Sequence, residues 1–275
     1  MKLSASNIAW DASADERMYG TLARMGYTGV EIAPTRIFPE SPYDRCADAA
    51  AFAARVRETY GLSVPSMQSI WYGRTENIFG TEQERAALAE YLRKAIDFAA
   101  AVHCGNLVFG CPKNRVGTNE KDWETAVAFF RKAGEYAARK GTRIGMEANP
   151  AVYGTQFVNE TKYAFALARD VASEGFGVNL DVGTMLTNGE SLDGIAEHLS
   201  LVTHVHVSEP GLAPVECGGL HRELAQVLRS GGYEGFVSVE MKNPGSEETL
   251  LRSLEQVREA VSYTHLDVYK RQALG

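Results

Sequence analysis

The 275-residue sequence has few cysteines and no long apolar run, and both shortages restrict what the protein can be. Its four cysteines form no C-x-x-C pair, which disfavours a zinc knuckle and a disulfide framework. No segment reaches the roughly 18 apolar residues of a membrane span. The opening segment MKLSASNIAWDASADER also lacks the apolar stretch of a signal peptide. We therefore expect a cytoplasmic protein without a membrane partner.

A block of positive charge is missing as well. Lysine and arginine together number 28 against 35 aspartates and glutamates, which gives a formal net charge of -7. This balance disfavours binding to the phosphates of nucleic acid, so we expect no nucleic-acid partner. With 45% apolar and 23% charged residues, the composition is that of an ordinary globular protein with a large core.

Short β-rich runs alternate with longer helical patterns along the whole chain, as is typical of crossover units around a parallel sheet. The apolar residues of several helical runs recur at intervals of three and four, as at Leu88, Leu92 and Ile96. Strands are predicted at residues 2–8, 29–33, 63–69, 106–109, 143–147, 177–182, 202–207 and 236–241. Helices are predicted at residues 15–25, 47–60, 82–102, 120–139, 160–172, 192–198, 219–229 and 247–261. Eight such units predict an α/β fold, a (β/α)8 TIM barrel.

The barrel units end before the last stretch of the chain. We expect residues 1–261 to form a single domain, because α/β barrels routinely reach about 250 residues. The remaining residues, 262–275, read SYTHLDVYKRQALG and resemble vector- or adaptor-derived read-through. We interpret this stretch as a non-native tail and give its His265 no functional role.

Four consecutive strands end in a side chain that can bind a metal. Glu147, Asp181, His206 and Glu240 end the fifth, sixth, seventh and eighth predicted strands. A barrel enzyme builds its active site at these carboxyl ends. Buried carboxylates without partners are costly, and three together also repel one another. Ion pairs with Arg or Lys would also stabilise these carboxylates. These strands, however, bring no nearby cation except Lys242. We therefore expect one divalent ion, either Mn, Mg, Co or Zn.

Several segments make a family resemblance specific. The opening SNIAW, the second strand GVEIA, the closing GYEGFVSVEM and the four strand-end residues resemble the sugar phosphate isomerase/epimerase branch of the xylose-isomerase-like superfamily. The likeness covers residues 1–261. It implies that Glu147, Asp181, His206 and Glu240 are the metal ligands, with His204 as the first histidine of an H-x-H pair.

The resemblance also implies a reaction. A bound metal polarises a carbonyl and its neighbouring hydroxyl, which acidifies the C–H bond between them. In the family the glutamates of the fifth and eighth strands lie on opposite sides of the substrate. By that analogy Glu147 and Glu240 are the catalytic acid and base, acting through an enediolate. The implied activity is a divalent-metal-dependent isomerase or epimerase of a small sugar, sugar phosphate or related polyol.

Two positions depart from the family pattern. Many sugar epimerases have a histidine three residues after the strand-six aspartate, where this chain has Thr184. They also have an arginine six residues after the ligand histidine, where this chain has Leu212. We therefore expect the substrate to be handled differently from a free ketose.

Other strand-end loops offer candidate substrate-binding residues. Aromatic, amide and charged side chains suit a carbohydrate with or without a phosphate. Each of them is also compatible with a purely structural role. The candidates are Trp10, Gln68, Lys113, Arg115 and Glu209.

Other activities remain open. A lyase or dehydratase of a keto-cyclitol or dehydroshikimate-like substrate would use the same metal and a glutamate base. An abasic-site endonuclease is a remote alternative, because that branch uses several more histidines from strands two and three. Here all six histidines lie at residue 103 or later. The expected partner is a small carbohydrate, and related barrels often form homo-oligomers.

Overall fold

Eight parallel strands form a barrel in the computed structural model, which describes residues 1–117, 119 and 121–262. The strand order is β2-β1-β8-β7-β6-β5-β4-β3. Two parallel bridges, Gly29 to Ser63 and Ile32 to Met67, then link β2 to the β3 region and complete the ring. The strands are β1 (Lys2–Ser6), β2 (Gly29–Glu31), β3 (Ser66–Met67), β4 (Asn106–Phe109), β5 (Arg143–Glu147), β6 (Phe176–Asp181), β7 (Val202–Val207) and β8 (Phe236–Val239). The predicted TIM barrel is confirmed.

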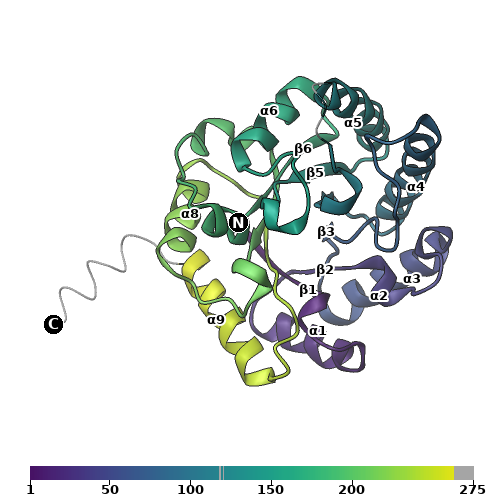
Figure 1. The fold of residues 1–275 in the computed structure, drawn as a ribbon. Coiled ribbons are helices and arrows are strands. Elements are labelled where there is room, and N and C mark those ends of the chain that lie inside the picture. The colour runs from purple at the N-terminus through teal and green to yellow at the C-terminus, as the bar shows by residue number, and fades with distance from the viewer. Residues whose placement is uncertain (118, 120, 263–275) are drawn as a thin grey trace.

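Helices surround the strands in chain order (Figure 1). Their ends follow local rules: Thr81 and Glu84 form a capping box at the start of α4, and Gly61 ends α3 with a φ of 70°. The helices are α1 (Asp15–Arg24), α2 (Pro34–Ile37), α3 (Cys46–Tyr60), α4 (Glu82–Ala101), α5 (Asp122–Arg139), α6 (Thr161–Val171), α7 (Val182–Asn188), α8 (Gly219–Ser230) and α9 (Glu247–Ser262). The predicted tail, apart from Ser262 at the end of α9, lies outside the described residues.

The predicted helix over residues 192–198 is wrong. The structure instead begins α7 directly after β6, where the Asp181 side chain accepts a hydrogen bond from the Thr184 backbone N–H at 2.5 Å. The chain then forms only a 3-10 helix, η6 (Ala196–Leu201), before β7.

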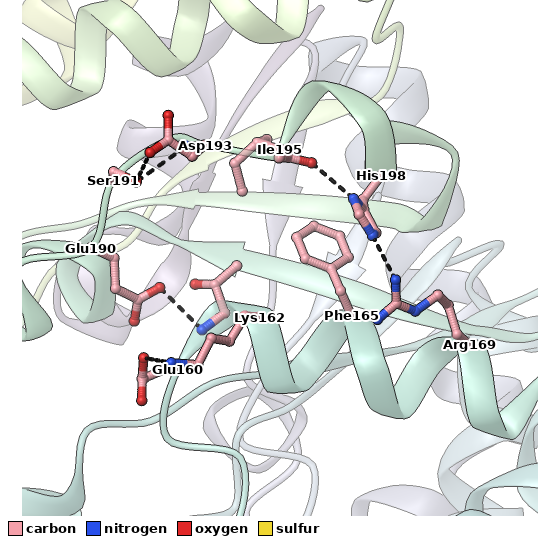
Figure 2. Close-up of a pocket in the computed structure, with 11 residues that line it drawn as sticks. Glu160, Lys162, Phe165, Arg169, Glu190, Ser191, Asp193, Ile195 and His198 are labelled. Carbon is pink, nitrogen blue, oxygen red and sulfur yellow. Dashed lines mark hydrogen bonds and ion pairs between the residues drawn. The ribbon is translucent and has the colours of Figure 1, made fainter.

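A hollow of about 340 Å³ lies on the outer wall between α6 and the segment that leads into η6. Figure 2 shows Phe165 beside His198 there, and Arg169 bonded to the His198 ring at 3.0 Å. None of the four predicted metal ligands lines this hollow. It is separate from the strand ends of the barrel.

Side chains alternate between the two faces of every strand. One set is apolar and buried against the helices: Leu3, Val30, Met67, Leu107, Ile144, Val178, Val205 and Val237. The other set is polar, points into the bore of the barrel and includes Ser4, Glu31, Ser66, Asn106, Glu147, Asn179, His204 and Ser238. Members of this second set bond across neighbouring strands, as Asn106 does to Ser66 at 3.1 Å. The same alternation points every predicted metal ligand inward.

Among the residues that the structure describes, no helix has the length and apolar character needed to cross a bilayer.

Candidate metal centre

The structure brings the four predicted ligands together at the carboxyl ends of β5 to β8. Glu147, Asp181, His206 and Glu240 each offer one ligand atom, and these atoms all lie within 4.8 Å of one another. Strand register produces this grouping, because Asp181 is paired with His206 across β6 and β7. His206 is fully buried, while Glu147 and Glu240 are 9% and 7% exposed. These four residues are hereafter called the ligand cluster.

His206 gives the clearest sign of what the ligand cluster can hold. Its Nδ1 atom lies 3.0 Å from Glu147 Oε1 and 3.1 Å from Glu240 Oε2, yet it makes no hydrogen bond within the described structure. Buried polar atoms are rarely left without a partner. When Nδ1 is unprotonated, its lone pair faces the carboxylates of Glu147 and Glu240 and fits a divalent cation, because oxygen and imidazole donors suit Mn²⁺, Mg²⁺, Co²⁺ and Zn²⁺.

Amide side chains hold the Glu147 carboxylate in place. Asn179 Nδ2 donates to Oε1 at 2.7 Å, and Asn149 Nδ2 lies 3.3 Å from Oε2. Gly110 follows β4 and makes room for this group, since a Cβ atom there would come within 2.8 Å of Glu147 Oε2. A larger residue at this position would displace the carboxylate.

The Asp181 carboxylate accepts two hydrogen bonds in addition to its place in the ligand cluster. Its Oδ1 accepts the capping hydrogen bond of α7, and its Oδ2 accepts one from Ser208 Oγ at 2.6 Å. Burial, followed by the negative charge of Glu147, raises the pKa of Asp181. The helix cap and the hydroxyl fix the orientation of this carboxylate without a cation.

Sequence reasoning missed Glu31, although it ends the second strand in the quoted run GVEIA. Its side chain is fully buried, and its Oε2 accepts a hydrogen bond from His206 Nε2 at 2.9 Å. Burial favours the neutral acid, but the charge of His206 and hydrogen bonds from both histidines outweigh it and lower the pKa of Glu31. The predicted strand runs over residues 29–33 and places Glu31 in its middle, so the rule that polar strand ends mark a site did not find it. A lone acid inside an apolar strand was the signal for this residue.

Arg115 lies in the interior rather than in an open loop. Its guanidinium group donates to the backbone oxygens of Gly110, Glu147, Phe157 and Val158 and to Asn149 Oδ1. Burial lowers the pKa of Arg115 to about 10. The side chain thereby ties the loop after β4 to the loop after β5, and we assign it to support of these loops rather than to contact with a substrate.

The other substrate-binding candidates lie in different surroundings. Trp10 is buried and its Nε1 donates to Asp15 at 2.8 Å, while Gln68 Nε2 donates to Ser6 Oγ at 2.8 Å and lies 3.2 Å from Glu31 Oε1. Lys113 is exposed, and Glu209 lies 3.6 Å from the His221 ring. Among these four candidates, Gln68 is the one that hydrogen bonds connect to the ligand cluster, through Glu31.

A parallel β/α barrel with three carboxylates and an imidazole at its strand ends defines the class of this protein. The chain belongs to the family of xylose isomerase-like TIM barrels, whose model matches residues 20–263. No curated protein matches it.

Solved structures share the fold at low sequence identity. The chain is similar to the 3-keto-D-glucoside 4-epimerase of E. coli, at 18% identity over 95% of this chain and 98% of that one, with a TM-score of 0.74. The D-psicose 3-epimerase of Clostridium cellulolyticum is 15% identical over 95% of this chain and 97% of that one, also with a TM-score of 0.74. A family 2 AP endonuclease of Brucella melitensis is 23% identical over 91% of this chain and 97% of that one, with a TM-score of 0.70. At these identities the likeness concerns the fold alone.

Proposed function

We propose that the protein is a divalent-metal-dependent isomerase or epimerase that acts on a small sugar, a sugar phosphate or a related polyol. The observation that carries this proposal is the ligand cluster itself, where Glu147 and Glu240 approach the unbonded His206 Nδ1 to 3.0 and 3.1 Å. The epimerases among the structural neighbours add support for the substrate class. The formal charge of -7 argues against the action on DNA that the name of another neighbour indicates.

Glu147, Asp181, His206 and Glu240 would hold the metal in this proposal. When bound, the ion would polarise the substrate carbonyl and its neighbouring hydroxyl and so make the C–H bond between them acidic. Asn179 and Asn149 keep the Glu147 carboxylate directed into the site. The burial of both glutamates limits access of water to them.

Glu147 and Glu240 would carry the proton. One carboxylate takes the proton from carbon, and the electron pair of the broken C–H bond remains in the enediolate of the substrate. If the other carboxyl group returns a proton to the opposite face of the same carbon, the product is an epimer. If one carboxyl group carries the proton to the adjacent carbon, the product is the aldose or ketose isomer.

The metal content of the purified protein tests the first part of the proposal. Elemental analysis should find about one equivalent of Mn, Mg, Co or Zn, and Glu147→Ala and Asp181→Ala should both lose it. Asp181→Ala also removes the cap of α7, at a cost of about 1 kcal/mol, which leaves most of a typical domain stability. Asp193→Ala, on the exposed outer wall, should keep the metal. A metal-free protein that also fails to recruit these ions would overturn the mechanism.

Turnover in deuterated water tests the second part. Ketoses and their phosphates should incorporate deuterium at the carbon that loses its proton, and the mass should otherwise be conserved. A product with a new unsaturated chromophore would instead identify a lyase. Cleavage of abasic DNA without action on sugars would contradict the proposal.

Metal affinity should depend on pH. Burial raises the pKa of Glu240 to about 7, with Glu147 and Asp181 adding to the rise and His206 opposing it. A metal binds the deprotonated carboxylate, so affinity should be highest above pH 7 and weaken as protons compete below it. We expect about a tenfold loss per pH unit for each displaced proton, measurable by calorimetry with Mn²⁺. Affinity that stays flat between pH 8 and 5.5 would contradict the raised pKa of Glu240.

A further inference from the structure

The Glu31 carboxylate lies behind His206, on the side opposite the ligand cluster. Its Oε2 is 2.9 Å from His206 Nε2, and the other nitrogen of that ring, Nδ1, faces Glu147 and Glu240. We infer that Glu31 is a positioning residue that fixes the tautomer of His206 and so directs an unprotonated Nδ1 at the metal. This inference rests on the proposed metal site but does not depend on which sugar is turned over.

Hydrogen-bond chemistry supports this role. A charged carboxylate can only accept, so it requires a proton on the Nε2 atom that it contacts. With that proton on Nε2, the lone pair of the neutral ring is on Nδ1, which is the atom that a metal can bind. Metal-binding histidines commonly donate their second ring nitrogen to a carboxylate in this way, and loss of such a partner weakens metal binding about 10–100-fold.

The surroundings of Glu31 make its orientation definite. Gln68 Nε2 lies within hydrogen-bond distance of Oε1, while Oε2 faces the two histidines, with His204 Nε2 at 3.2 Å. His204 Nε2 also lies 2.8 Å from Ser238 Oγ, which in turn contacts Ser4 Oγ. Each oxygen of the carboxylate therefore has a separate set of donors, and these contacts cross the bore from β2 to the residue after β3 and to β7 and β8.

This division of donors predicts what an amide at position 31 would do. In Glu31→Gln the amide oxygen should stay beside the Gln68 donor, which turns the NH₂ group toward His206. An NH₂ group donates, so it favours the ring with an unprotonated Nε2 and a proton on Nδ1. That is the wrong tautomer for metal binding, although the size of the side chain is unchanged.

A double variant reverses this effect. In Glu31→Gln combined with Gln68→Glu, the new carboxylate at position 68 accepts from the amide of residue 31. The amide oxygen then faces His206 and again accepts from Nε2. The double variant also keeps one negative charge in this buried region, so it tests the inference even if the single variant folds poorly.

Zn²⁺ binding without substrate provides the test, by competition with a chromophoric chelator and with melting temperatures as the check on folding. We expect Glu31→Gln to weaken Zn²⁺ binding about 10–100-fold and the double variant to recover most of that loss. The matched control is Glu160→Gln in the outer hollow of Figure 2, where Glu160 contacts Lys162. Its Zn²⁺ affinity should stay within twofold of the parent protein.

Proton–nitrogen NMR spectra of the Zn²⁺-loaded protein provide a second readout. The Nε2 proton of His206 should resonate far downfield in the parent protein because it bonds to a carboxylate. It should shift in Glu31→Gln and move back in the double variant.

Three results would overturn the inference: unchanged Zn²⁺ affinity in folded Glu31→Gln, no recovery in the double variant, or a second Zn²⁺ equivalent that depends on Glu31. Absence of sugar turnover would defeat the proposed function and leave this result intact.

Discussion

Replacement of Glu240 by glutamine is expected to lower sugar turnover by at least about 10³-fold while the barrel stays folded. The amide has the size of the carboxylate, but it can neither accept a proton from carbon nor neutralise a divalent ion. Glu240 is 7% exposed and follows β8, whose apolar residues Val237 and Val239 keep their packing in the variant. Deuterium incorporation into the substrate, measured with Mn²⁺ supplied in excess, checks this expectation.

The matched control for Glu240 lies at the other end of the same strand. Glu234 is exposed just before β8, so Glu234→Gln should turn over substrate at the parent rate. If Glu240→Gln retained more than a tenth of the parent activity, Glu240 would be neither the base nor the acid of the reaction. Loss of turnover in both variants would indicate that the changes disturb β8 itself, and not that the Glu240 carboxylate is needed for the reaction.

Replacement of Arg115 by methionine should lower the free energy of unfolding by about 3–5 kcal/mol. The variant removes the Arg115 donor from the oxygens of Gly110, Glu147, Phe157, Val158 and Asn149. Val158 O keeps the Asn149 backbone N–H at 3.2 Å, and Phe157 O keeps the Thr155 hydroxyl at 3.4 Å. Each buried acceptor that loses its partner costs about 1–3 kcal/mol, and relaxation of the loops recovers part of the sum. Urea unfolding followed by circular dichroism measures the change.

Lys113 gives the comparison for Arg115, because it lies two residues earlier in the same loop and is exposed. Lys113→Met should change the free energy of unfolding by less than about 0.5 kcal/mol. A stable Arg115→Met protein with a raised KM for a sugar phosphate would show that Arg115 binds substrate after all. That outcome would restore the role that its place in the sequence suggests.

The positions of the strands could be predicted well from the sequence. Residues 106–109, 143–147 and 202–207 match β4, β5 and β7 at both ends. These runs are short and apolar on one face, and helices with a clear apolar stripe separate them. The same alternation allowed the ligand cluster to be predicted, because a polar side chain at the end of such a strand points into the bore.

The features of the fold and of the site that the sequence did not predict depend on contacts between distant residues. The start of α7 depends on a cap from Asp181, a residue that the sequence marks as a metal ligand. The role of Arg115 depends on carbonyl groups up to 43 residues away, which no local pattern reveals. Glu31 and His206 are 175 residues apart, and only closure of the barrel brings them together.

The polar bore also bears on how the barrel folds. A shift of one residue in the pairing of a strand would turn its histidine or carboxylate toward the helices and put valine or leucine into the bore. In β7, such a shift would place His204 and His206 against apolar helix faces, where imidazoles lose their hydrogen bonds. The residues assembled for chemistry therefore also penalise misaligned barrels, so selection for activity and selection for correct strand alignment act on the same side chains.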